Sequence, residues 1–217
     1  MGVRKTALGE AVLDKAALDK AGVARMRSRV TAADIAIMAR ISTADSPVLD
    51  RVLPALSRAA NHSRLWLGIA AGLAASESKW GRRAALRGVA GIAIASATTN
   101  VLGKGLARRL RPTAEVPWPR RLSRVPRSTS FPSGHAASAA AFATGVALEV
   151  PALAVPVGTL AAAVGASRVV TGVHFPSDVA AGFAIGTCAG LLTVVTGDPA
   201  VTLRKRRDPL LVYRPEV

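Results

Sequence analysis

Long apolar runs, separated by short basic or proline-containing segments, dominate the chain from residue 65 onward. They cover about residues 65–75, 84–103, 135–150, 152–166 and 179–196. Apolar runs flanked by Arg and Lys are typical of helices that enter a membrane, because cations gather where the membrane meets water. The pattern therefore predicts an all-α fold, an integral membrane helical bundle of about five to six spans.

Several of these runs are short for a membrane span. Crossing a hydrocarbon core of ~30 Å takes about 20 helical residues, and several runs reach only about 15. We therefore expect the helices to continue into their polar flanks, or the bilayer to thin around them.

Residues 1–60 show a different pattern, rich in alanine and charge. Ile35, Met38 and Ile41 fall on one stripe, which predicts an amphipathic helix that starts with a capping box at Thr31 and Asp34. A second such stretch covers residues 47–60. We interpret both as interfacial helices or helices packed under the bundle; a soluble helical hairpin is the alternative. The first 30 residues contain no continuous apolar segment, so no cleaved signal peptide is expected.

Three regions follow from these patterns. An N-terminal amphipathic helical region covers residues 1–60, a membrane domain covers 61–197, and a basic tail covers 198–217. The tail and the Arg- and Pro-rich segment 108–127 are expected to hold anionic lipid headgroups at the membrane surface.

Glycines at four-residue spacing predict where helices approach closely. Gly182, Gly186 and Gly190 give one side of the last run a continuous groove for a neighbouring helix, and Gly68 with Gly72 forms a similar pair in the first run.

Four other residues of the runs carry specific expectations. Trp66 and Trp80 bracket the first run as interfacial aromatics. Arg87 interrupts the second run and is expected to extend its cation toward the interface. Cys188, the single cysteine, is expected to be a small packing residue, and one cysteine excludes an intrachain disulfide or a cysteine-based metal cluster.

Charge and composition narrow the class of protein. The formal net charge is +16, but half of the residues are hydrophobic and only 4% are aromatic. Because the basic residues flank apolar runs and do not form one polar face, we expect membrane lipids as partners and no nucleic acid. Alanine and arginine richness indicates a bacterial protein, for which the inner membrane is the expected location.

Three short segments at the edges of the runs carry candidate chemistry. Consecutive spans reverse direction, so the end of the second run, the start of the third, the end of the fourth and the start of the fifth meet at one membrane face. The segments at these ends are Lys104-(six residues)-Arg111-Pro112, Pro132-Ser133-Gly134-His135 and Ser167-Arg168-(five residues)-His174-(three residues)-Asp178.

The cations and the helix start suit a phosphate group. Arg111 and Arg168 offer planar forks that match phosphate oxygens, and Lys104 offers a point charge. Ser133 and Gly134 precede a helix, where free backbone N–H groups favour an anion and glycine allows close approach.

The histidines suit a displacement in two steps. One imidazole can attack phosphorus while the other protonates the leaving oxygen. Asp178 follows His174 closely and is positioned to hold its N–H and set its tautomer. His62 has no such partners and is interpreted as an interfacial polar residue. A serine hydrolase built on Ser133 is disfavoured, because the chain has no GxSxG motif.

Together the segments resemble the three signature motifs of the type-2 phosphatidic acid phosphatase family, KxxxxxxRP, PSGH and SRxxxxxHxxxD. All signature positions are present in order, and the resemblance covers about residues 50–196. That family shares its site with vanadium-dependent haloperoxidases. The resemblance implies a helical bundle and metal-independent dephosphorylation, without a cofactor, through a phosphohistidine.

Carried onto this chain, the resemblance implies that His174 is the nucleophile, Asp178 orients it and His135 is the general acid. The implied phosphate-binding residues are Lys104, Arg111, Ser133, Gly134 and Arg168. The segment with Pro117, Trp118 and Pro119 is expected to help shape the mouth of the site.

The sequence thus predicts a multi-pass membrane phosphatase of lipid phosphates: phosphatidic acid, phosphatidylglycerol phosphate, or polyprenyl phosphates or diphosphates. A vanadate-dependent haloperoxidase and a non-enzymatic basic membrane protein are the alternatives. The membrane face that carries the site, the lipid tail and the oligomeric state stay open.

Overall fold

The computed structural model describes residues 3–105, 109–112, 120 and 128–195, with side chains from residue 20 and none for 102–105. Within these ranges every regular element is helical. The α-helices are α1 (Val3–Thr43), α2 (Leu53–Ala59), α3 (Arg64–Ala75), α4 (Lys79–Gly105), α6 (Gly134–Glu149), α7 (Ala154–Val170) and α8 (Pro176–Val195). Short helical turns η1 (Val48–Val52), η2 (Asn61–Ser63) and η3 (Pro151–Leu153) connect some of them.

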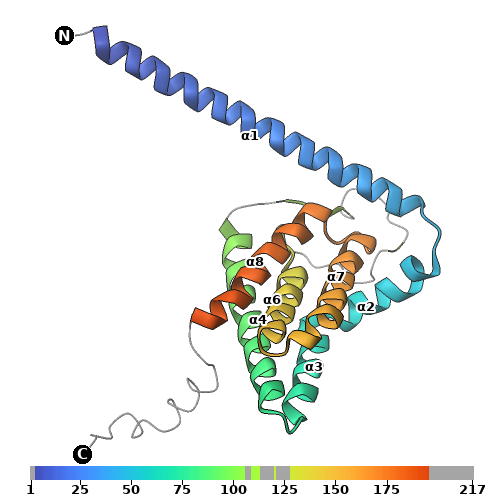
Figure 1. Cartoon of the computed structure of the whole chain (residues 1–217). Coiled ribbons are helices and arrows are strands. Elements are labelled where there is room, and N and C mark those ends of the chain that lie inside the picture. The colour runs from blue at the N-terminus through green and yellow to red at the C-terminus, as the bar shows by residue number, and fades with distance from the viewer. Residues whose placement is uncertain (1–2, 106–108, 113–119, 121–127, 196–217) are drawn as a thin grey trace, which may run out of the picture.

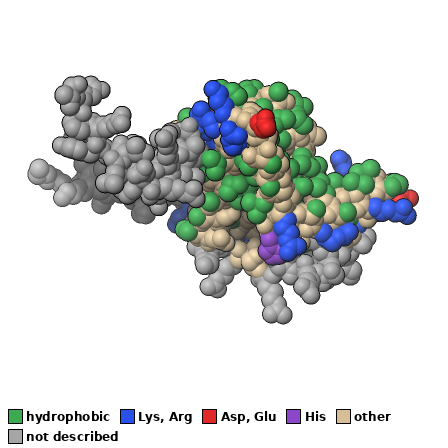
Figure 2. All heavy atoms as spheres, turned by 90° about the horizontal axis from the view of Figure 1, so that it is seen from below, with side chains coloured by type: hydrophobic (Ala, Val, Ile, Leu, Met, Phe, Trp, Pro, Cys, Tyr) green, Lys and Arg blue, Asp and Glu red, His purple; other side chains and the backbone are tan. Residues whose placement is uncertain are grey.

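Helices α3, α4, α6, α7 and α8 run up and down beside one another, and α1 projects away from them (Figure 1). All five apolar runs are helices, as the sequence predicts. Two of these segments, Pro151–Val170 and Pro176–Val195, are long and apolar enough to cross a membrane by the test of length and hydropathy. Figure 2 shows hydrophobic side chains spread over the bundle, with Lys and Arg in separate groups.

The centre of the bundle is α6, whose small side chains let its neighbours approach. Ala136, Ala139 and Phe142 are fully buried. A Cβ atom on Gly182 would lie 2.5 Å from the Ser133 carbonyl oxygen, and one on Gly186 would lie 2.1 Å from that of Ala137. The predicted glycine groove of α8 is therefore confirmed, and α6 fills it.

The other glycine pair and the first tryptophan behave differently from the prediction. A Cβ on Gly68 or Gly72 would meet no atom within 4 Å in the described part of the chain, so this pair faces none of the described helices. Trp66 is only 1% exposed, and its ring centroid lies 5.4 Å from that of Phe142. The sequence spacing showed which residues share a face of α3, but it did not show which face packs against the bundle. Trp80 is 48% exposed, in keeping with an interfacial position.

Arg87 and Cys188 also depart from the prediction. Arg87 is buried, and its Nε donates to Glu149 Oε1 at 2.7 Å. A carboxylate at the end of α6 therefore holds the cation inside the bundle, so it does not reach for the interface. Cys188 lies exposed on α8 and does not pack inside the bundle.

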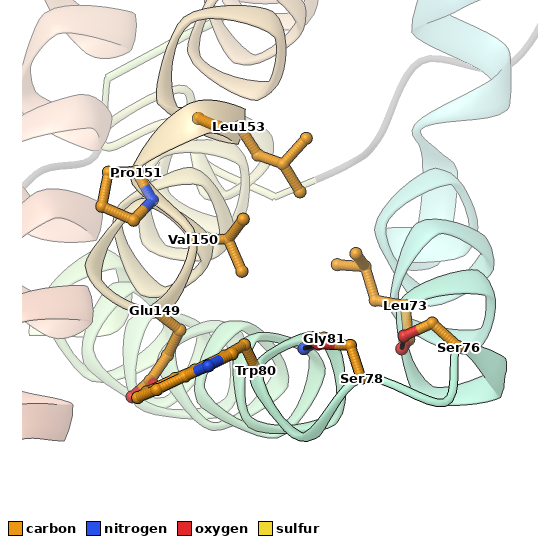
Figure 3. Close-up of a pocket in the computed structure, with 10 residues that line it drawn as sticks. Leu73, Ser76, Ser78, Trp80, Gly81, Glu149, Val150, Pro151 and Leu153 are labelled. Atoms are coloured by element: carbon orange, nitrogen blue, oxygen red, sulfur yellow. Dashed lines mark hydrogen bonds between the residues drawn. The ribbon is translucent and has the colours of Figure 1, made fainter.

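A groove of about 450 Å³ lies near this buried ion pair, at the end where α3 turns into α4 (Figure 3). It is lined by Leu73, Ser76, Ser78, Trp80, Gly81, Glu149, Val150, Pro151, Ala152 and Leu153. None of these is a predicted site residue.

The N-terminal helix is longer than predicted. α1 continues through Thr31, whose Oγ1 donates to the Arg27 carbonyl at 3.0 Å. Asp34 is 2% exposed and bonds to α8, so it does not cap a helix start. Ile35 is 59% exposed while Met38 is 5% exposed. The capping-box prediction failed because an Asp inside a helix is tolerated when tertiary partners satisfy its oxygens.

Candidate active site

The predicted segments meet at one end of the bundle. The Ser133 N–H donates to the Asp178 carbonyl at 3.0 Å, which joins the start of α6 to the start of α8. Arg111 Nη1 donates to the Val173 carbonyl at 2.7 Å, which joins the segment after α4 to the loop after α7. The four helix ends therefore share one face, as the reversal of consecutive helices requires (Figure 1).

His174 is buried in the loop between α7 and α8, at 3% exposure. Its Nδ1 lies 2.7 Å from the Ser130 carbonyl oxygen, which only accepts, so Nδ1 carries the proton. Nε2 therefore keeps its lone pair, and it lies 3.3 Å from Arg111 Nη1. This tautomer leaves one nitrogen of His174 able to attack an electrophile.

Burial lowers the pKa of His174 to about 4. The Asp178 carboxylate opposes this decrease, whereas the cations of Arg111 and Arg168 add to it. At neutral pH the ring is therefore uncharged and nucleophilic. Burial also lowers the pKa of Arg111, and Asp178 partly offsets that effect.

Asp178 is fully buried in the first turn of α8. Its Oδ2 accepts the Phe175 N–H at 2.8 Å and the Ser130 hydroxyl. The same oxygen lies 3.8 Å from His174 Nδ1, which is an electrostatic contact longer than a hydrogen bond. The Ser130 carbonyl thus fixes the tautomer of His174, and Asp178 holds Ser130 and adds negative charge.

His135 is the second residue of α6 and is partly buried. Its Nε2 lies 3.1 Å from Asn61 Oδ1, in the turn η2. Because an amide oxygen accepts, this contact places a proton on Nε2. His135 also interacts electrostatically with Arg168, His174 and Arg111. Both imidazoles therefore belong to one site.

Arg168 is 1% exposed, and its Nη1 donates to Ser57 Oγ at 2.6 Å. Within the described part of the chain, its Nε is buried without a hydrogen-bond partner. A buried cationic donor without an acceptor is costly, by at least about 1–3 kcal/mol. An oxyanion bound beside Arg168 would satisfy this donor.

Ser133 caps α6, and its side chain accepts the Ala136 N–H at 3.4 Å. A Cβ on Gly134 would lie 3.8 Å from Thr99 Oγ1, an ordinary contact, so the protein itself leaves room there. Lys104 lies in the last turn of α4, but its side chain is outside the described residues. Pro117, Trp118 and Pro119 lie outside the described residues as well.

The structure adds residues that the sequence analysis missed. Arg109 was expected to be a surface charge, yet it binds Asp34 and Asp178 at 2.7 and 2.8 Å. Arg120, also expected at the surface, is paired with Asp50 at 2.6 Å. Asn61 contacts His135 across 74 positions of sequence. Among these contacts, only the one made by Asp34 had a signal in the local sequence, because an acidic residue lies beside the apolar stripe of α1.

Among the described residues, no group of three or more His, Cys, Asp or Glu is arranged to hold a metal ion. The cations, the buried nucleophilic imidazole and the helix start instead form a cradle for an oxyanion. Such a group of donors at one end of a helical bundle suits the binding of an oxyanion such as phosphate.

A family model described as the PAP2 superfamily matches residues 84–200. The chain belongs to this family, which confirms both the resemblance found in its motifs and the prediction of a phosphatase. The relatives and the structural neighbour that follow are named as phosphatases.

Decaprenylphosphoryl-5-phosphoribose phosphatase of Mycobacterium tuberculosis is 36% identical over 185 residues, which cover 83% of this chain and 100% of the relative. Lipid A 1-phosphatase of Rhizobium johnstonii is 44% identical over 66 residues, or 30% of this chain and 27% of that protein. The crystal structure of a transmembrane PAP2-type phosphatidylglycerolphosphate phosphatase from Bacillus subtilis superposes with a TM-score of 0.59 at 27% identity, covering 77% of this chain and 86% of that one.

Proposed function

We propose that this chain removes a phosphate from a lipid-linked phosphomonoester through a phosphohistidine at His174. The observation that carries the proposal is the state of this ring. Its Nδ1 is held by the Ser130 carbonyl, its Nε2 lone pair faces Arg111, and burial lowers its pKa to about 4. A neutral imidazole fixed beside cations is prepared to attack a phosphorus atom.

The reaction then takes two displacements. His174 Nε2 attacks phosphorus, and the bond from phosphorus to the lipid oxygen breaks. Arg111, Arg168, Lys104 and the N–H groups at the start of α6 stabilise the charge on the phosphoryl oxygens. The negative charge of the bound phosphate favours the protonated form of His135, and this form gives a proton to the leaving oxygen. Because Asn61 holds Nε2–H, Nδ1 is the nitrogen that transfers this proton.

In the second displacement, His135 takes a proton from water, and the oxygen of that water attacks the phosphohistidine. The bond between phosphorus and Nε2 breaks, inorganic phosphate leaves, and His174 returns to its neutral form. The Ser130 carbonyl and the Asp178 charge stabilise the cationic phosphoimidazole between the two displacements.

The proposal includes a membrane location. Helices α3, α4, α6, α7 and α8 would cross or enter the bilayer as a multi-pass bundle of about five spans, with α1 and α2 at the interface. Exposed apolar side chains on α7 and α8 support this placement; they include Val155, Leu191, Leu192 and Val195. For a bacterial protein this is the inner membrane, and the lipid tail stays in the bilayer while its phosphate enters the site.

Among the candidate substrates, we favour a phosphomonoester carried by a polyprenyl lipid. The support is the mycobacterial relative, whose whole length aligns with this chain and whose name specifies a decaprenyl-linked phosphoribose. Phosphatidylglycerol phosphate and phosphatidic acid are the competing substrates.

The test is phosphate release by the purified protein in detergent, with a chelator present, from all three substrate classes. His174→Ala should abolish release, and labelled phosphate should be trapped on residue 174 of the wild type after an acid-free quench. His62→Asn is the matched control, because His62 is exposed and has a φ of 54°, which Asn tolerates. Full activity in His174→Ala would refute the nucleophile.

A further inference from the structure

One guanidinium joins two buried carboxylates beside the candidate active site. Arg109 Nη1 lies 2.8 Å from Asp178 Oδ1, and its Nη2 lies 2.7 Å from Asp34 Oδ2. Asp178 and Asp34 are 0% and 2% exposed. The two acids come from α8 and α1, so this bridge ties the N-terminal helix to the carboxylate beside His174.

Ser177 provides a second connection between α8 and Asp34 of α1. Its backbone N–H donates to Asp34 Oδ1 at 2.9 Å, and its hydroxyl donates to Asp34 Oδ2 at 2.6 Å. Arg109 Nη1 donates in turn to the same hydroxyl at 2.7 Å. The Arg109 guanidinium also lies 4.0 Å from the centre of the Phe175 ring. The geometry of the whole group is therefore closely determined.

Docking of α1 alone would not need an acid at position 34. Met38, one turn further along, already packs against Val169 and Val179. A buried carboxylate is expensive unless it is paired, and an apolar residue would dock the helix without that cost. The presence of Asp34 in the interface therefore calls for an electrostatic role.

The charge balance of the group supplies such a role. Two carboxylates share one guanidinium, so the trio of Asp34, Arg109 and Asp178 keeps a net charge of −1. Without Asp34, Arg109 would neutralise Asp178 alone, and less negative charge would remain for His174. Asp178 favours a cationic His174 ring, and Arg111 and Arg168 oppose it. His135 also opposes it when it is protonated.

We infer that Asp34 is a positioning residue of the active site, which holds Arg109 and the start of α8 so that Asp178 keeps its place and its charge beside His174. The inference rests on the proposed function. It gives the long N-terminal helix a part in catalysis although Asp34 touches neither the nucleophile nor the phosphate.

The experiment compares Asp34→Asn with wild type and with Met38→Ala, using phosphate release in detergent. Asp34→Asn keeps the size of the side chain and one acceptor oxygen for the Ser177 N–H. It removes the negative charge and replaces the oxygen that accepts from Arg109 with an NH2 group. We expect kcat to fall about 10- to 100-fold, as when a residue that holds the partner of a functional histidine is removed. KM should change less than about threefold, because Asp34 does not contact substrate.

The pH profile separates positioning from simple stability. Removing a negative charge lowers the pKa of His174 further, so the acid limb of kcat/KM should move to lower pH in Asp34→Asn. The titration of the substrate phosphate is common to all variants and does not affect the comparison. Met38→Ala weakens the docking of α1 without changing any charge, and should leave the acid limb where it is.

Wild-type kcat and an unmoved acid limb in a folded Asp34→Asn would overturn the inference, as would an equal loss of kcat in Met38→Ala at equal melting temperature. If Asp34→Asn does not fold, Ser177→Ala takes its place; it should lower kcat at constant KM, and an unchanged kcat would again overturn the inference. Failure of the proposed function shows differently, as an inactive wild type or an active His174→Ala.

Discussion

Gly134→Ala is expected to stabilise the protein while damaging the active site. Gly134 is the first residue of α6, directly after the N-cap Ser133. The first N–H groups of a helix have no partner within it, so here they are available to a bound anion. A methyl group at this position would occupy space that a phosphate bound to those N–H groups requires.

The magnitude of both effects follows from the local geometry. The new Cβ would lie 3.8 Å from Thr99 Oγ1, an ordinary van der Waals contact, so the described part of the fold accommodates it without strain. Alanine also reduces the freedom of the unfolded chain, which stabilises a helix by roughly 0.5–1 kcal/mol and raises Tm by about 1–4 °C. A loss of about 1.4 kcal/mol or more in phosphate binding would lower kcat/KM at least about tenfold.

The assay measures Tm and phosphate release on the same detergent preparations. Gly158→Ala is the matched control, because Gly158 lies inside α7 and a Cβ there would meet no atom within 4 Å. Both variants should gain stability, but only Gly134→Ala should lose activity. Inorganic phosphate or vanadate should also inhibit Gly134→Ala less strongly than wild type.

Equal kcat/KM for Gly134→Ala, Gly158→Ala and wild type would refute the placement of phosphate at the start of α6. A large drop in Tm for Gly134→Ala would refute the claim that the protein leaves room for a Cβ there.

Three further predictions address packing, pH and the opposite end of the bundle. Gly186→Ala should destabilise the protein severely, because its Cβ would lie 2.1 Å from the Ala137 carbonyl oxygen; a Tm within about 2 °C of wild type would contradict this packing. The pKa of His174 is about 4 when folded and 6.5 when unfolded, so stability should fall by roughly 3 kcal/mol as pH decreases from 6.5 to 4. In His174→Asn, Tm should fall less steeply between pH 6.5 and 4 than in wild type. An equal slope in both proteins would contradict the lowered pKa of His174 in the folded state. Glu149→Gln leaves the buried Arg87 without its anionic partner and should lower the free energy of unfolding by about 3–5 kcal/mol. A loss of kcat at unchanged Tm would contradict this and show that the end of the bundle near Glu149 takes part in the reaction.

The glycine pairs show how much of the helix packing could be predicted from the sequence. The spacing of Gly182, Gly186 and Gly190 identified the helix face that meets α6, because residues four apart lie on one side of a helix. The same rule failed for Gly68 and Gly72, since an identical spacing on α3 faces no neighbour among the residues that the structure describes. Spacing determines which residues share a face, and the neighbour that covers the face depends on the whole fold.

Part of the candidate active site was likewise predictable from the sequence, and part was not. Reversal of consecutive helices was enough to bring the three motif segments to one end, and residue chemistry was enough to indicate a phosphate. The hydrogen bond from His174 to the Ser130 carbonyl, the contact of His135 with Asn61 and the bridge from Asp34 through Arg109 to Asp178 were not predictable. These contacts join segments with no local pattern in common.

The amino-acid sequence by itself determined the helical class, the end of the bundle that carries the chemistry and the family, because periodicity, chain reversal and spaced motifs are local properties. Only the tertiary structure decided which nitrogen of His174 carries the proton, which donor of Arg168 lacks an acceptor among the described residues and that Asp34 lies buried on α1. Those features depend on atoms that come within about 3 Å of each other only after the chain has folded.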